Sequence, residues 1–292
     1  MTVTELARIA ALVFIACSLI VMGDTAGKAL TTAGVSPLFV AWTRFGVAAL
    51  ALLPFSGLTL PELRCLAHPL VMLRGVFVTC GISSILTALQ TEPIANVFGA
   101  FFIGPIVSTL LAVVFLGERP SLARVGLLIL GFVGVMLVVK PGFGASTGIF
   151  FAVLAGVFYG AFLATTRAIA GRYRPRLLLL SQLVIGAVVL APFGSTAATP
   201  SLMTPALWAL IGLSAFGSAA GNYLIVQANR RADASLIAPL IYTQLIAATL
   251  SGVLIFGDWP DAVALLGLTV ILLSGLGALW LARSSVQSSV QN

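Results

Sequence analysis

The chain has 292 residues, of which 60% are hydrophobic and only 8% charged; its formal net charge is +7 and its mean hydropathy is +1.15. So few charged side chains cannot cover the surface of a water-soluble protein of this size, which excludes a soluble globular protein. The excess of basic residues gathers at the ends of apolar segments, which favours a role in membrane topology over nucleic-acid binding.

Ten apolar segments follow one another along the chain, each close to the length that an α-helix needs to cross a bilayer. They span residues 6–26, 37–58, 70–90, 94–116, 122–139, 148–170, 176–193, 205–228, 234–256 and 261–282. Glycine- and proline-containing turns separate most of them. The sequence therefore predicts an all-α integral membrane protein with ten transmembrane helices.

The first segment has the outline of a signal peptide, because Arg8 precedes an apolar core and small residues follow near Ala26. The internal repeat described next pairs this segment with residues 148–170. Since a removed signal is not needed to complete a repeat, we expect residues 6–26 to remain a membrane helix.

Residues 105–120, PIVSTLLAVVFLGERP, recur as residues 245–260, LIAATLSGVLIFGDWP. Six aligned pairs are identical, including Gly117 with Gly257 and the final Pro120 with Pro260. Between these two pairs, Glu118 aligns with Asp258, which also carries a carboxylate. A second match joins residues 37–55 to residues 175–193 at nearly the same separation. The chain is therefore predicted to contain two five-helix repeats, residues 1–140 and 141–292, within one membrane domain.

Because five is an odd number, the second repeat enters the membrane in the opposite sense to the first. Such inverted repeats are typical of carriers that open alternately to the two sides around a site near the midplane. If the N-terminus is cytoplasmic, one side holds most arginines, Arg74 and Arg167 included, and the other only Lys28 and Lys140. This asymmetry predicts that both termini are cytoplasmic.

The two repeats, each with a fourth helix ending in G-[ED]-x-P and a glycine-rich fifth, resemble the drug/metabolite transporter superfamily, and more narrowly its EamA-type exporters. The resemblance implies export of amino acids or similar small amphipathic metabolites across a bacterial-type inner membrane by alternating access. The alternatives are a proton-coupled drug or nucleotide-sugar carrier and, in another class, a non-transporting membrane scaffold.

Motifs for catalysis are absent from the sequence. Cys17, Cys65 and Cys80 have no metal-binding or redox spacing, and the single histidine, His68, stands beside Pro69 without a partner motif. No nucleophile motif or glycine-rich phosphate loop is found. We therefore predict no enzymatic activity, no catalytic residue, no metal and no cofactor.

Arg44 lies seven residues after Pro37, about 10 Å into its predicted helix. An ionised group at that depth needs a partner or a water-filled cavity. Two compatible interpretations stay open. Arg44 binds a substrate carboxylate, or it pairs with Asp24, which is also the candidate for coupling.

Other polar and aromatic residues at membrane depth are candidates for substrate binding, because amides and phenols in a bilayer face protein or water. They are Trp42, Gln90, Asn96, Phe101, Tyr159, Gln182, Asn222, Tyr223, Tyr242 and Gln244. Helix packing is the alternative role for each. Pro105 and Pro239 fall inside the fourth and ninth segments and predict hinges or fixed kinks.

Acidic residues are confined to segment ends, and we expect Glu118 and Asp258 to cap the helices that follow them. Without a carboxylate at the midplane, a uniporter is favoured, with proton exchange through Asp24 as the alternative. The expected partners are a small-molecule substrate and the lipid bilayer. GxxxG spacings allow either a monomer or a weak homodimer.

Overall fold

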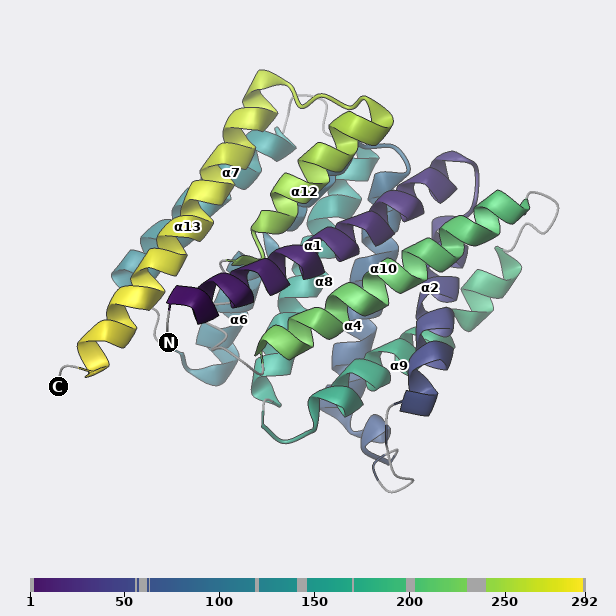
Figure 1. Ribbon diagram of the computed structural model, residues 1–292, viewed down its shortest axis with the longest axis horizontal. Helices are drawn as coiled ribbons and strands as arrows, with labels where there is room; N and C mark the ends of the chain where they lie inside the picture. The colour runs from purple at the N-terminus through teal and green to yellow at the C-terminus, as the bar shows by residue number, and fades with distance from the viewer. Residues whose placement is uncertain are drawn as a thin grey trace.

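A computed structural model of the chain describes residues 3–55, 57, 62, 64–118, 121–140, 146–169, 171–197, 203–229 and 240–290. Within these ranges every regular element is a helix, and no strand occurs (Figure 1). The predicted all-α class is therefore confirmed for the described part of the chain.

The first half of the chain supplies α1 (Val3–Thr32), α2 (Pro37–Leu52), α4 (Pro69–Leu89), α5 (Ile94–Phe101), α6 (Gly104–Leu116) and α7 (Leu122–Val139). The second half supplies α8 (Thr147–Ala168), α9 (Pro175–Thr196), α10 (Pro205–Asn229), α12 (Thr243–Ser251) and α13 (Ala262–Val290). Short helical turns are η1 (Leu53–Phe55), η2 (Arg64–Ala67) and η4 (Gly252–Phe256).

Proline sets where several helices begin. Pro37, Pro69, Pro175 and Pro205 are each the first residue of a helix. At that position the ring fixes a helical φ, and the missing N–H would have had no partner within the helix. The sequence thus determines these four boundaries locally.

Seven helical stretches in the described residues are long and apolar enough to cross a bilayer. They are Ala7–Thr32, Pro37–Phe55, Pro69–Leu89, Ile94–Leu116, Thr147–Ala168, Pro175–Thr196 and Pro205–Ile225. Three shorter apolar helices, Val125–Val139, Thr243–Phe256 and Ala262–Gly277, fall within the remaining predicted segments. The chain is a multi-pass membrane protein by this criterion, and ten crossings remain a prediction.

Large apolar side chains cover much of the outer surface of the bundle. Phe115, Leu254 and Trp280 are each more than 70% exposed. In water, such an exposed apolar surface would favour association of the protein with itself or other proteins. In a bilayer the lipid tails contact it at no cost in free energy.

Helix pairing is nearly unchanged when the two predicted repeats are exchanged. α1 packs along α10, and the equivalent pair is α8 along α4. α2 packs on α9 and α7 on α13, so each of these pairs maps onto itself (Figure 1). This packing supports the predicted five-helix repeat.

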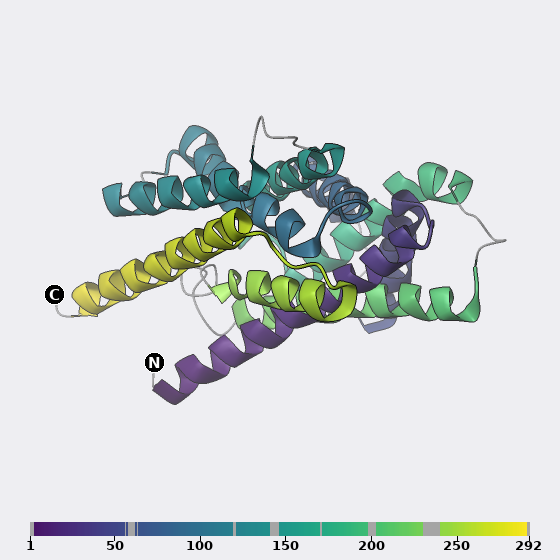
Figure 2. The same ribbon diagram turned by 90° about the horizontal axis from the view of Figure 1, so that it is seen from above.

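The first and last helices place both ends of the chain on the same side of the molecule (Figure 2). α1 forms one continuous helix that packs along α10 and α12, so residues 6–26 are part of the helix bundle. That they are not removed as a signal peptide remains a prediction. Which side of the membrane the ends face remains a prediction.

The predicted fourth segment is divided into α5 and α6, and the break lies at Phe102 and Ile103, just before Pro105. The ninth segment has an equivalent turn at Ile241 and Tyr242, while Pro239 lies outside the described residues. The rings of Phe102 and Tyr242 stack at 4.7 Å with 16° between their planes. The two breaks therefore meet at the point where the halves join.

The GxxxG spacings are used within this chain. A Cβ on Gly217 would lie 2.6 Å from the Leu19 carbonyl oxygen, and one on Gly160 would lie 2.5 Å from that of Gly104. These glycines let α10 approach α1 and α8 approach α6. They are consequently buried between helices of one molecule, and a homodimer through them is not required.

Candidate functional site

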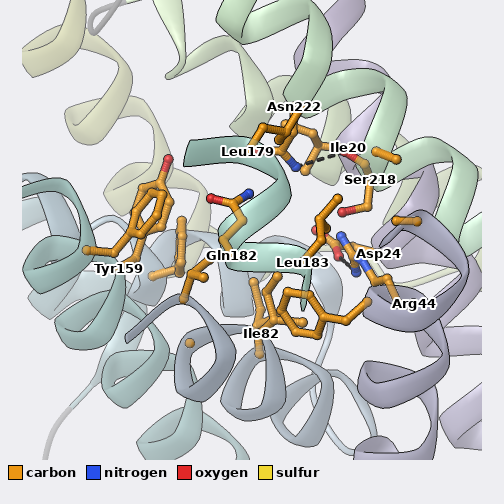
Figure 3. Close-up of a pocket in the computed structure, with 18 of the residues that line it drawn as sticks. Ile20, Asp24, Arg44, Ile82, Tyr159, Leu179, Gln182, Leu183, Ser218 and Asn222 are labelled. Atoms are coloured by element: carbon orange, nitrogen blue, oxygen red, sulfur yellow. Dashed lines mark hydrogen bonds and ion pairs between the residues drawn. The ribbon is translucent and has the colours of Figure 1, made fainter. Parts of the chain in front are cut away.

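A cavity of about 100 Å³ lies inside the bundle, at the seam between the two halves (Figure 3). Seven of the residues predicted from the sequence line it: Asp24, Arg44, Phe101, Tyr159, Gln182, Asn222 and Gln244. The volume holds several water molecules. It is smaller than the roughly 300 Å³ or more of a typical ligand pocket, so this conformation encloses the site tightly.

Arg44 and Asp24 form an ion pair across α2 and α1. Nη1 of Arg44 lies 2.5 Å from Oδ1 of Asp24, and both side chains are about 5% exposed. The alternative in which Arg44 pairs with Asp24 is thus observed. The ion pair is electrically neutral, and Asp24 already occupies one of the guanidinium nitrogens to which a substrate carboxylate would bind. The role of Arg44 in substrate binding therefore remains a prediction.

A second buried arginine, Arg74 of α4, was expected only among the residues that set topology, yet it is 6% exposed. Its Nε donates to the Thr166 hydroxyl at 2.8 Å, and Nη1 donates to the Leu178 carbonyl at 2.8 Å. Its Nη2 donates to Oε1 of Gln182 at 2.9 Å. Arg74 thereby ties α4 to α8 and α9 directly behind the cavity.

The sequence contained a signal for Arg74. It lies five residues after Pro69, inside an apolar segment, as Arg44 lies seven residues after Pro37. The depth argument that selected Arg44 applies to both positions. Arg74 was grouped with the arginines of loops and helix ends, so its depth in the apolar segment was not considered.

Aromatic rings form one wall of the cavity. The ring of Tyr159 lies 4.9 Å from that of Phe101 and stacks on Phe162 at 5.7 Å. The Arg74 guanidinium lies 4.4 Å from the centre of the Phe162 ring. In Figure 3, Tyr159 stands on the side away from the Asp24–Arg44 pair, so the cavity has an aromatic side and a polar side.

Amide side chains contribute further polar groups. Asn222 of α10 donates from Nδ2 to the Ser218 carbonyl at 2.8 Å, and Gln244 of α12 is buried at 6% exposure. Both line the cavity with Gln182 of α9. Each of these three amides comes from the second half of the chain.

Five predicted residues do not line the cavity. The Trp42 indole donates to the Ala187 carbonyl at 3.1 Å, which fixes α2 on α9. Tyr242 stacks on Phe102, and Gln90 is exposed at the end of α4. Tyr223 lines an apolar hollow of about 440 Å³ between α2 and α10, and Asn96 lies in α5. Their part in substrate binding remains a prediction.

No group of three or more metal-ligating side chains occurs among the described residues. Several acidic residues among those described instead form ion pairs near helix ends. Lys140 pairs with Asp261, whose Oδ1 also accepts a hydrogen bond from the Ala264 N–H at 2.9 Å. Hydrogen bonding from the Lys140 ammonium and from this backbone amide lowers the pKa of Asp261.

Asp258 does not cap α13 as expected, because Asp261 accepts the hydrogen bond from the Ala264 N–H there; a capping role of Glu118 at α7 remains a prediction. Glu118 and Asp258 each follow a left-handed glycine that ends the preceding helix, Gly117 or Gly257, both at φ 69°. The Glu118 N–H bonds to the Ala112 carbonyl at 3.2 Å, and the Asp258 N–H bonds to the Gly252 carbonyl at 3.0 Å. Both helices therefore end at a left-handed glycine, and the backbone N–H that follows it reaches a carbonyl six residues earlier.

Each of these carboxylates meets a cation in the last turns of the first helix of the other half. Asp258 pairs with Lys28 of α1, whose ammonium also lies 4.6 Å from the centre of the Phe256 ring. Glu118 pairs with Arg167 of α8 at 3.4 Å. The sequence repeat matched the two carboxylates but not their partners.

The model of the EamA-like transporter family matches the chain twice, over residues 7–140 and 146–280. The chain is 27% identical to an S-adenosylmethionine uptake transporter of Rickettsia bellii over 86% of each protein. It is 30% identical to a riboflavin transporter of Rhizobium johnstonii, covering 81% of this chain and 78% of that protein. It is 25% identical to a riboflavin transporter of Vibrio cholerae over 82% of each.

A solved structure titled only as the crystal structure of a protein has the same fold, with a TM-score of 0.64. The match covers 94% of this chain and 98% of that one at 19% identity. At this identity the likeness concerns the fold alone.

Proposed function

This chain belongs to the EamA-like transporter family, and on that premise we propose that it carries small amphipathic metabolites, amino acids among them, across a bacterial-type inner membrane. The movement proposed is facilitated export by alternating access. The protein then binds and releases its substrate without chemical change, so it is not an enzyme.

The observation that carries this proposal is the cavity at the seam of the two halves. Asp24, Arg44 and Phe101 come from the first half, and Tyr159 and Gln182 from the second. A site shared by two bodies changes shape when one body rocks against the other. Its aromatic wall suits an apolar group, and its buried amides and charges suit a polar group on the same molecule.

The relatives support this class of substrate. S-adenosylmethionine and riboflavin, named for those proteins, each combine a flat ring system with a strongly polar portion. The S-adenosylmethionine relatives are named for uptake, whereas our proposal is export. A carrier without a coupling ion follows the substrate gradient, so direction depends on concentration rather than on the site.

Two ion pairs support alternating access. Lys28–Asp258 and Arg167–Glu118 occupy equivalent places in the two halves, but the first is largely buried while the second is about half exposed. In inverted repeats, equivalent contacts lie at opposite membrane faces. We therefore assign the described conformation as closed at the Lys28 end and loosened at the Arg167 end, with the reverse arrangement in the other state.

Uniport is favoured because Asp24 is the one acidic residue that lines the cavity in the described residues, and Arg44 pairs with it. The second candidate, proton-coupled transport, rests on the same residue. Protonation of Asp24 would break the pair and release Arg44, which could couple a proton to the substrate.

The test is counterflow in proteoliposomes with radiolabelled L-phenylalanine, S-adenosylmethionine and riboflavin. Accumulation of one of them without a pH gradient or membrane potential supports uniport. Counterflow that is accelerated by a pH gradient in the wild type but not in Asp24→Asn would favour proton coupling. Protein-free vesicles are the blank, and absence of counterflow for all three compounds would refute the transport proposal.

A further inference from the structure

Gln182 is held at the cavity by an arginine that can only donate hydrogen bonds. Nη2 of Arg74 lies 2.9 Å from the side chain of Gln182, and both residues are about 6% exposed. A guanidinium has no acceptor atom, so the amide oxygen of Gln182 must be the atom that faces Arg74. The usual ambiguity in amide orientation is thereby removed.

This orientation turns the amide nitrogen of Gln182 away from Arg74. The nitrogen carries two N–H donors, and no acceptor among the described residues takes a hydrogen bond from it. Gln182 lines the cavity, and in the view of Figure 3 it stands between Tyr159 and the Asp24–Arg44 pair. The side chain therefore offers donors, not acceptors, to a bound molecule.

The charges around the cavity favour an anionic ligand group. Asp24 and Arg44 cancel each other at 2.5 Å. Arg74, behind Gln182, has no carboxylate within ion-pair distance among the described residues, and neutral oxygens and the Phe162 ring are its partners. A buried cation without an anion is costly, and an anion bound nearby offsets that cost.

We propose that Gln182 donates its amide N–H groups to the carboxylate of the transported metabolite, and that Arg74 is the residue that positions Gln182 and supplies the positive potential. The inference rests on the proposed function and narrows its substrate class to molecules that carry a carboxylate. Gln182 belongs to the substrate contact, while Arg74 acts through it.

The neighbouring wall defines the rest of the ligand. Tyr159, Phe101 and Phe162 line the same cavity. The Arg74 guanidinium contacts the Phe162 ring. A molecule with its carboxylate at Gln182 can place an apolar or aromatic group against these rings. Aromatic and large apolar amino acids have this shape, which makes L-phenylalanine the probe.

The experiment compares L-phenylalanine with L-phenylalaninamide, which differs by the loss of the carboxylate, in proteoliposome transport. In Gln182→Glu the new carboxylate pairs with Arg74, which keeps the buried cation compensated but removes both N–H donors. We expect the transport ratio of phenylalanine to phenylalaninamide to fall by about tenfold to a hundredfold, through KM more than through kcat.

Arg74 is tested by a pair of variants. Arg74→Gln removes the charge and lets the Gln182 amide turn, so the same ratio should fall, whereas Arg74→Lys keeps the charge and should recover part of it. Arg172→Gln makes the same exchange at an exposed arginine outside the bundle and should leave the ratio at the wild-type value. An unchanged ratio in both Gln182→Glu and Arg74→Gln overturns the proposal.

Folding is followed by the melting temperature of each purified variant. Gln182→Leu removes the donors without adding a charge and replaces Gln182→Glu in the comparison if the latter does not fold. If the wild type transports riboflavin or phenylalaninamide but no probe with a carboxylate, the proposed carboxylate subsite is wrong and the proposed function still holds. Counterflow of no probe at all overturns both.

Discussion

The two ends of the bundle share a glycine followed by an acidic residue, but the ion pairs formed there differ in burial. At one end α6 stops at Gly117 and Glu118 reaches Arg167; at the other η4 stops at Gly257 and Asp258 reaches Lys28. The cation is 46% exposed in the first pair and 8% exposed in the second.

The difference follows from where each cation sits on its helix. Arg167 is one residue from the end of α8, whereas Lys28 is a full turn before the end of α1. Phe256 covers the Lys28 ammonium. The shared sequence thus builds the same turn twice, and the depth of the partner decides whether the ion pair is buried.

The largest effect is expected from Asp258→Asn, which leaves the Lys28 ammonium buried with only an aromatic face for compensation. We expect the free energy of unfolding to fall by about 3 kcal/mol, the lower end of the range for breaking a buried pair. Denaturant unfolding in detergent measures it. The double variant Lys28→Met/Asp258→Asn removes both charges and should recover most of the loss; no recovery would mean that the pair is not a coupled unit.

Two matched glycine substitutions test what the ends share. Gly117→Ala and Gly257→Ala each force alanine into a left-handed conformation, and an added Cβ meets no atom within 4 Å at either position. Backbone strain is then the one effect of either substitution, so each should lower the free energy of unfolding by about 1 kcal/mol, and the two losses should be equal. Unfolding midpoints that differ by more than this cost would show that the two turns are not equivalent.

Glu118→Gln breaks the exposed pair and should cost about 0.5 kcal/mol, because water solvates both groups after the change. The small cost should disappear at about 1 M salt, where screening is nearly complete. If Glu118→Gln lowered the free energy of unfolding as much as Asp258→Asn, the two ion pairs would not differ in strength as their burial predicts. Measuring both variants at low and high salt decides this.

The smallest effect concerns Asp261, three residues after Asp258 and about half exposed. Its pKa is lowered in the folded protein by Lys140, so its contribution is complete above the unfolded pKa of about 4 and is lost as pH falls through the lower folded pKa. Asp261→Asn keeps an oxygen for the Ala264 N–H. Wild type should exceed it by a few tenths of a kcal/mol at pH 6.

That difference should shrink toward zero near pH 3, as followed by thermal unfolding across the pH range. A difference that grows on acidification would have the wrong sign for a carboxyl with a lowered pKa. It would mean that Lys140 does not stabilise the ionised form.

Much of the architecture could be predicted from local sequence. Pro37, Pro69, Pro175 and Pro205 begin α2, α4, α9 and α10 because proline fits the first helical position. Gly117 and Gly257 end two other elements, α6 and η4, because a left-handed residue is needed there. The apolar segments predicted a membrane bundle because length and composition suffice for that inference.

The candidate site was predicted in part. Depth along its helix selected Arg44, the alignment of the repeats selected Gln182 as its counterpart, and both line the cavity. The same sequence could not show that Trp42 and Tyr242 pack against neighbouring helices, because the rotation of each helix about its axis depends on what it contacts.

The sequence by itself determined that this chain is a duplicated bundle of apolar helices, because hydrophobic length, proline starts and glycine ends act within a few residues of one another. Only the tertiary structure decided that Asp24 neutralises Arg44, that Arg74 lies behind Gln182, and that Lys28 is buried where Arg167 is not. Burial and pairing of charge depend on residues tens to hundreds of positions apart, and those distances are set when the helices pack.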